Sequence, residues 1–261
     1  MSGLLPDSSN PVEYIQHHLV NLSIGEGFWA IHLDTLFISW LLGGAIIYAG
    51  YRVGRDLSLE RPSGMQNILE AVLEFVDDLV RSVLGRGHTM IGTLAMTAFL
   101  WVLLMNLMDM IPVDLIPWLV GLFGADHFRA VPTADPQAPL GMALLVFVLM
   151  LYYNIRIKGF YQYMMEFLTH PFGIWLFPIN FVMKLIEEIA KPLSLGLRLF
   201  GNLFAGELGF LLVALLPFWV QPVPGTIWLL FHLLVVVLQA FIFMVLTVMY
   251  LALAHMGHEE H

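Results

Sequence analysis

The last long apolar stretch of the chain reads TIWLLFHLLVVVLQAFIFMVLTVMYLALAH, from Thr226 to His255, and it contains no Asp, Glu, Lys or Arg. The same freedom from charge extends back to Leu208 and on to His258. A helix needs only about 20 apolar residues to cross the hydrocarbon core of a bilayer. This part of the chain is therefore long enough for two crossings, and it predicts a membrane protein.

The composition agrees with that prediction and excludes several function classes. Hydrophobic residues make up 59% of the 261 positions and charged residues 12%, against about 25% charged residues in soluble domains. The net charge of -9 comes without a basic patch interleaved with aromatic residues, so we expect no nucleic-acid partner. The chain has no cysteine, which excludes thiol catalysis and cysteine-ligated metals. Its start, MSGLLPDSSNPVEY, lacks the basic and apolar regions of a cleavable signal peptide.

Long apolar runs predict the number of membrane spans; most of them are nearly free of charge, whereas the fourth carries several charged residues. We expect five, at residues 35–53, 89–111, 140–157, 178–217 and 225–255, with residues 1–34 as an external segment. Arg52 and Arg55 follow the first run, and Arg156 and Lys158 follow the third. Positive charges favour the cytoplasmic side, so the pattern predicts an external N-terminus and a cytoplasmic C-terminus.

Residues 63–86 have a different pattern, because apolar side chains recur at helical spacing opposite a run of acidic ones. This pattern is typical of an amphipathic helix at the membrane surface, here the cytoplasmic one. At about 1.5 Å per residue the last two helices would exceed a hydrocarbon core about 30 Å thick, so we expect a long tilted hairpin. With no internal repeat, the fold class is an all-α membrane protein with one membrane domain, residues 1–261.

One face of the fourth predicted span carries the polar residues of the chain's chemical centre. Helical geometry places these residues within about 40° of the direction of Arg198: Lys184, Glu187, Lys191, Ser194, Arg198 itself and Asn202. Beyond them the face continues as Ala205 and Gly209, small residues that allow another helix to approach closely. An arginine near mid-membrane costs at least about 2.5–3.5 kcal/mol on insertion scales. No carboxylate of this chain is expected at the depth of Arg198.

The fifth predicted span has two strongly polar interior residues, His232 and Gln239, on one face. In an antiparallel hairpin of two helices, each pair of residues at the same depth, one from each helix, has residue numbers that add up to nearly the same total. That rule places His232 level with Glu207, and Gln239 level with Arg198. Glu207 itself points away from the face of Arg198, because it lies about 180° round the helix.

The segment KPLSLGLRLFGNLFAGE, from Lys191 to Glu207, resembles the signature of subunit a of the F-type ATP synthase. NLMDMIPVDLIP, from Asn106 to Pro117, the spacing to His232 and Gln239, and the order of segments support the resemblance over nearly the whole chain. The first 30 residues and residues 118–139 match the family only loosely, so the resemblance assigns no role to residues in these two segments.

The resemblance implies a proton-conducting stator subunit in the bacterial inner membrane that makes no ATP itself and needs no cofactor or metal. The implied partners are the c-subunit ring, the subunit b stalk, the rest of the synthase and the lipid bilayer. Arg198 would face the c-ring, and Asn202, Glu207, His232 and Gln239 would form the outer proton path. Further candidates are Asp109 and Asp114 for outer access, and Lys184, Glu187, Glu188, Lys191 and Ser194 for the cytoplasmic exit.

Plainer interpretations stay open at this point. Arg198 could be a structural charge between helices, Glu207 and His232 a packing hydrogen bond, and the lysines and glutamates near Lys184 a solvated face. For Asp109 and Asp114, a role in a turn at the end of a helix fits the sequence as well as a role in outer access. His17, His18 and the tail HMGHEEH fit solvated segments better than a metal site. A transporter would show repeated halves with broken helices, and an intramembrane hydrolase would need a nucleophile with a base; neither pattern is present.

Overall fold

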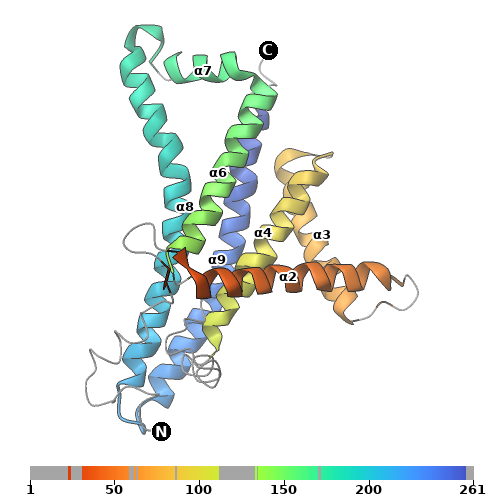
Figure 1. Cartoon of the computed structure of the whole chain (residues 1–261), viewed down its shortest axis with the longest axis vertical. Helices are drawn as coiled ribbons and strands as arrows, with labels where there is room; N and C mark the ends of the chain where they lie inside the picture. Colours follow the sequence, from red (N-terminus) through yellow and green to blue (C-terminus); the bar gives the residue numbers. More distant parts are fainter. Residues whose placement is uncertain are drawn as a thin grey trace. The chain divides into compact units, whose positions relative to one another are not determined.

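The computed structural model describes residues 23–24, 31–58, 62, 64–85, 87–111, 133, 135–169 and 172–256. The helices follow in the order α2 (Leu33–Arg55), α3 (Gly64–Leu84), α4 (Thr89–Leu107), η2 (Met108–Met110), α6 (Gln137–Lys158), α7 (Phe160–Thr169), η4 (Ile174–Leu176), α8 (Phe177–Ala214) and α9 (Pro222–Met256) (Figure 1). Two short strands, β1 (Ser23–Ile24) and β2 (Ile31–His32), pair antiparallel before α2. Apart from this hairpin the described chain is helical, which confirms the all-α prediction.

Five helices are long and apolar enough to cross a membrane, as predicted. They are Leu33–Arg55, Thr89–Met110, Gln137–Lys158, Phe177–Ala214 and Pro222–His255. Each observed helix lies within a few residues of its predicted run, because the charged or proline-containing segments that flank the runs end the helices. Arg52 and Arg55 occupy the last turn of α2, and Arg156 and Lys158 that of α6.

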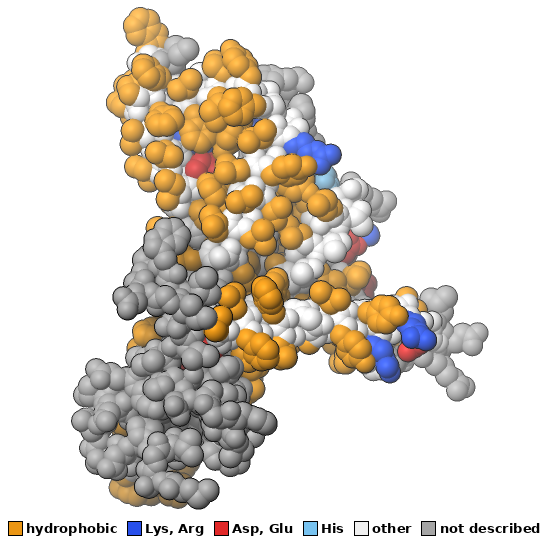
Figure 2. Space-filling view, in the orientation of Figure 1, with side chains coloured by type: hydrophobic (Ala, Val, Ile, Leu, Met, Phe, Trp, Pro, Cys, Tyr) orange, Lys and Arg blue, Asp and Glu red, His pale blue; other side chains and the backbone are white. Residues whose placement is uncertain are grey.

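The spans keep most of their apolar surface outside the chain's own core. Only 17–33% of the most apolar window of each span is buried within the chain. Ile47 is 75% exposed and Trp40 73%, and hydrophobic side chains cover much of the described surface in Figure 2. Extended apolar surface of this kind marks contact with a membrane or a partner protein.

The amphipathic helix predicted at residues 63–86 is α3, Gly64–Leu84. It buries Val76 and Val80, one turn apart, and exposes most of its polar side chains. Gly85 ends the helix with a φ of 77°, a left-handed conformation that glycine adopts readily at helix C-termini. Its location at the membrane surface stays a prediction.

The short helix α7 (Phe160–Thr169) is absent from the sequence prediction. It begins after Gly159, whose φ is 82°, and Asn180 of α8 closes the turn that follows it. The Asn180 amide donates hydrogen bonds to the carbonyl oxygens of Leu168 (3.1 Å) and Gly173 (2.8 Å), and its Oδ1 accepts one from the backbone N–H of Phe172 (3.2 Å). Asn180 therefore connects α7 to the start of α8.

The connection between α8 and α9 is as long as predicted but lies three residues earlier in the sequence. α8 ends at Ala214, and α9 begins at Pro222. Proline suits the first position of a helix, because the backbone N–H that it lacks would have no partner within the helix there. The side-chain amide of Gln221 donates to the carbonyl oxygens of Ala214 (3.0 Å) and Leu216 (2.7 Å). These bonds satisfy carbonyl groups at the end of α8 that have no partner within the helix.

The chain divides into two compact units. The first comprises residues 1–55, 100–138 and 199–241, and the second residues 56–99, 139–198 and 242–261. Fully buried residues of the first include Val102, Met105, Leu203, Leu211 and Val236; those of the second include Val76, Ala95, Met150, Leu195 and Phe243. The expectation of a single membrane domain stays a prediction.

Candidate functional site

A buried titratable pair in the first unit joins His232 of α9 to Asp109 of η2. His232 is 1% exposed and Asp109 is 4% exposed, and Nε2 of the imidazole is hydrogen-bonded to Oδ2 of the carboxylate. The sequence indicated Asp109 only as a candidate for outer access and gave His232 a different neighbour, Glu207. The structure thus brings together a buried imidazole and a buried carboxylate from two different elements.

Two glycines of α8 make room for α9 beside this pair. A Cβ atom on Gly206 would lie 1.9 Å from Cε1 of His232, and one on Gly209 would lie 2.2 Å from the Trp228 ring. Trp228 also donates its indole N–H to the carbonyl oxygen of Gly206 (3.1 Å). The close approach predicted at Gly209 is therefore made by α9 of the same chain. Glu207, the neighbour of Gly206, is 3% exposed.

Further polar contacts of the first unit involve amides. Nδ2 of Asn202 donates a hydrogen bond to Oε1 of Gln239 (2.8 Å). The sequence predicted Gln239 level with Arg198, whereas the structure places it beside Asn202, one turn further along α8. Nδ2 of Asn106 donates to the carbonyl oxygen of Val236 (3.3 Å), one turn from Gln239 on α9. Within the described chain, Gln239 Nε2 and Asn106 Oδ1 are buried without a hydrogen-bond partner. Asn106 was not among the predicted site residues, because an amide at a helix end has no distinctive spacing.

Arg198 is exposed on α8, a helix apolar enough to span a membrane. Its Nη2 lies 3.4 Å from Oγ of Ser194, which is exposed as well. Among the described residues, no carboxylate forms an ion pair with Arg198. Leu195 and Leu199, on either side of it in the sequence, are buried. The arginine is therefore directed away from the chain's own core and toward whatever surrounds α8.

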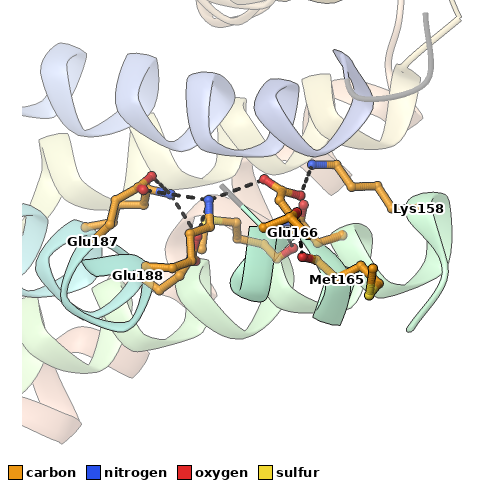
Figure 3. Close-up of polar contacts among 10 residues, drawn as sticks. Lys158, Met165, Glu166, Glu187 and Glu188 are labelled. Atoms are coloured by element: carbon orange, nitrogen blue, oxygen red, sulfur yellow. Dashed lines mark hydrogen bonds and ion pairs between the residues drawn. The ribbon is translucent and has the colours of Figure 1, made fainter. Parts of the chain in front are cut away.

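The second unit carries a network of six alternating charges around α7 and α8 (Figure 3). Each carboxylate oxygen of Glu166, on α7, forms an ion pair with one lysine: Oε2 lies 2.9 Å from Nζ of Lys158, and Oε1 lies 3.3 Å from Nζ of Lys184. Lys184 lies 3.7 Å from both Glu187 and Glu188, and Lys191 lies 2.8 Å and 3.0 Å from the same two carboxylates. Four predicted exit residues thus form one connected network.

Glu166 and Lys158 are members of this network that sequence reasoning missed. Burial alone would raise the pKa of the Glu166 carboxyl, but the hydrogen bond from Lys158 and the charges of Lys158 and Lys184 outweigh it and hold its pKa below the ordinary value. The missed signal was a single acid in an otherwise uncharged ten-residue helix that follows a basic helix end.

Asp114, the other candidate for outer access, lies outside the described residues, as do His17, His18 and residues 257–261. In the part of the chain that the structure describes, no group of three or more His, Asp or Glu side chains could hold a metal ion.

These features fit a multi-pass membrane protein with a buried histidine–aspartate pair and an exposed arginine on a helix apolar enough to span a membrane. The model of the family described as ATP synthase A chain matches residues 36–252. The chain is 47% identical to ATP synthase subunit a of Alkalilimnicola ehrlichii over 96% of this chain and 98% of the relative. It is 47% identical to ATP synthase subunit a 1 of Methylococcus capsulatus over 97% and 98%, and 49% identical to ATP synthase subunit a of Coxiella burnetii over 94% and 96%. The chain belongs to the ATP synthase A chain family.

Proposed function

We propose that this chain is the proton-conducting membrane stator subunit of a bacterial F-type ATP synthase. It forms two offset half-channels against a ring of c subunits, so that protons cross the membrane only by way of the turning ring. The chain makes no ATP itself, and needs no cofactor or metal. Its role is to couple proton flow to rotation of the c-ring.

The observation that carries this proposal is the exposure of Arg198. A guanidinium group is charged at every physiological pH, and an unpaired charge in the membrane interior is expensive unless a partner or water meets it. Since no described carboxylate pairs with Arg198, a carboxylate on another subunit is the natural counter-charge. The mid-membrane carboxylates of a c-ring, which pass one after another, fit that requirement.

The outer half-channel runs through the polar groups of the first unit. His232 and Asp109 exchange protons with the outside, Glu207 of α8 belongs to the same path, and the amides of Asn202 and Gln239 lead toward the c-ring. Asp114 contributes to access from the outside. Buried amides and carboxylates can hold the water molecules through which protons move, since a buried water needs two to four polar partners.

The cytoplasmic half-channel runs along the network of the second unit. Lys184, Glu187, Glu188, Lys191 and Ser194 lie on the part of α8 that precedes Arg198 in the sequence. The lysines offset the charge of the acids, which allows carboxylates to remain ionised at a helix surface and to accept protons that leave the c-ring.

Arg198 separates the two half-channels. Its permanent charge repels protons from a direct route and favours the ionised form of each c-ring carboxylate as it passes. One elementary charge that crosses the membrane supplies about 2.3 kcal/mol per 100 mV, so several crossings are needed for each ATP.

The charges at the span ends support a location in the bacterial inner membrane, with a periplasmic N-terminus and a cytoplasmic C-terminus. The c-ring, the subunit b stalk and the remainder of the synthase are the partners. Whether protons or sodium ions are carried depends on the c-ring carboxylate; the histidine in the outer path favours protons, because an imidazole exchanges protons in the physiological range.

The test is ATP-driven proton pumping in membranes that carry Arg198→Ala. Pumping should be abolished while the subunit still copurifies with its c-ring. Arg198→Lys retains a charge but loses the planar fork, and can deprotonate when it is buried, so pumping should be severely impaired. Arg81→Ala, on the amphipathic helix α3, is the matched control and should pump normally. Normal pumping by Arg198→Ala would contradict the proposal, and a bound small substrate in place of a c-ring would favour a transporter.

A further inference from the structure

Two buried polar atoms of the second unit have no hydrogen-bond partner among the described residues. They are Oη of Tyr163, on α7, and Oε2 of Glu188, on α8. Tyr163 is 3% exposed and Glu188 is 5% exposed. Buried polar groups nearly always have a partner, and one left without a partner costs about 1–3 kcal/mol. A partner molecule is therefore expected at these atoms.

The Tyr163 hydroxyl experiences the negative charge of the carboxylates of the network. Burial, with the negative charges of Glu188, Glu166 and Glu187, raises the pKa of the Tyr163 hydroxyl well above its ordinary value. The hydroxyl therefore keeps its proton throughout the physiological pH range. It can donate one hydrogen bond and accept others, but it does not ionise.

The geometry of Glu188 leaves one of its oxygens available. Oε1 accepts a hydrogen bond from Lys191 at 3.0 Å and lies 3.7 Å from Lys184, whereas Oε2 has no described donor. Lys184 links the two helices, because it lies near Glu166 of α7 and near Glu187 and Glu188 of α8 (Figure 3). Glu166 follows Tyr163 by three residues, and residues at that spacing share one side of a helix. The ion pairs of Glu166 thus hold the side of α7 that carries Tyr163 in place.

The charge of the network limits what the partner can be. Three lysines, Lys158, Lys184 and Lys191, are joined to three carboxylates, Glu166, Glu187 and Glu188. These groups balance, so neither a cation nor an anion is required for neutrality. A water molecule is neutral, donates to a carboxylate and accepts from a hydroxyl, and buried waters commonly bridge otherwise unpaired polar groups.

We propose that Tyr163 is a positioning residue of the cytoplasmic half-channel, whose hydroxyl and Glu188 Oε2 together hold one water molecule through which protons leave. In this step Glu188 gives its proton to the water, and the water passes one of its own protons on to cytoplasmic water. Glu188 becomes a carboxylate, and Tyr163 keeps its proton. This inference rests on the proposed function and extends it to α7.

The test compares Tyr163→Phe with Tyr161→Phe. Both remove one hydroxyl from α7, but Tyr161 is 79% exposed. Passive proton conductance is measured in vesicles that carry the full membrane sector after the ATP-hydrolysing sector has been stripped away. Tyr163→Phe should lower conductance about two- to tenfold, the rate ratio that corresponds to loss of one hydrogen bond. Tyr161→Phe should match the wild type.

Identical conductance in the two variants would overturn the inference. The proposed function would still stand if Arg198→Ala abolished pumping in the same membranes, so the two failures are distinguishable. If the Tyr163→Phe variant does not assemble with the c-ring, the test is a density map of the wild-type complex at a resolution that shows ordered water. A peak within hydrogen-bonding distance of both Oη and Oε2 supports the inference. A direct bond between these two atoms, or no peak, contradicts it.

Discussion

The imidazole of His232 occupies the space that any side chain at position 206 would need. Gly206→Ala should displace this ring from Asp109, because the new Cβ would lie 1.9 Å from Cε1. Overpacking of this kind costs about 1–3 kcal/mol. We expect slower proton pumping and a lower melting temperature of the purified complex.

Gly201→Ala is the matched control for this substitution. Gly201 lies on the same helix, and nothing lies within 4 Å of a Cβ built there. Since alanine is favoured over glycine in a helix by about 1 kcal/mol, this variant should pump normally and melt no lower than the wild type. Equal losses in both variants would show that glycine matters to α8 in general rather than to the position of His232.

The contact between His232 and Asp109 predicts that the two residues act as one unit. His232→Ala and Asp109→Asn should each slow proton conductance by about a hundredfold, near the low end of what a positioned acid–base group contributes. The double variant should be little slower than either single variant, because removal of one partner already removes the pair. Multiplicative losses in the double variant would mean that His232 and Asp109 work independently.

At the scale of residues, the sequence indicated most of the polar side chains but not their partners. His232 and Gln239 stand out because polar residues are rare in an apolar helix, and Arg198 because charge is costly there. Asp109 and Asn106 lie where the chain leaves a span, where polar residues are common. Asn106 and Asp109 become candidate site residues only because the structure packs them against Val236 and His232 of α9.

Among the helices, α7 depends on charge for its attachment. Glu166 has a lower pKa in the folded chain than in the unfolded chain, so its ion pairs contribute stability above the unfolded value of about 4.3, and that contribution is lost as the pH falls through the folded-state pKa. Glu166→Gln should therefore lower the melting temperature at neutral pH. The difference from the wild type should disappear in acid.

Glu74→Gln is the control for this pH dependence. Glu74 is exposed on α3, and it forms no ion pair with the described residues, so its substitution should leave the melting temperature unchanged at either pH. A Glu166→Gln effect that persisted unchanged in acid would show that packing, and not the ion pairs to Lys158 and Lys184, holds α7.

The spans were predictable as elements because a bilayer demands long apolar helices that satisfy their own backbone groups. The same requirement says nothing about α7, whose ten residues extend only about 15 Å. Its existence depends on Asn180 and on the lysines that Glu166 meets, and these contacts join residues whose proximity no periodicity in the sequence reveals.

For the whole molecule, the exposed apolar surface and the exposed arginine have one explanation. Spans that bury 17–33% of their most apolar windows within the chain leave broad faces for lipid and for other subunits. The face of α8 that carries Ser194 and Arg198 is proposed to meet the c-ring. Other exposed apolar positions of the same helix, such as Leu193, would then meet lipid or another neighbour.

Site-specific crosslinking tests that arrangement most directly. The chain has no native cysteine, so Ser194→Cys and Leu193→Cys can each carry a single thiol-attached photo-crosslinker in the assembled synthase. Both positions are exposed on α8, but they lie about 40° and about 140° from the direction of Arg198. Illumination should join the c subunit to the probe at position 194 and leave position 193 without that product. A c-subunit product from position 193 alone, or none from position 194, would contradict the account that Arg198 faces the rotor.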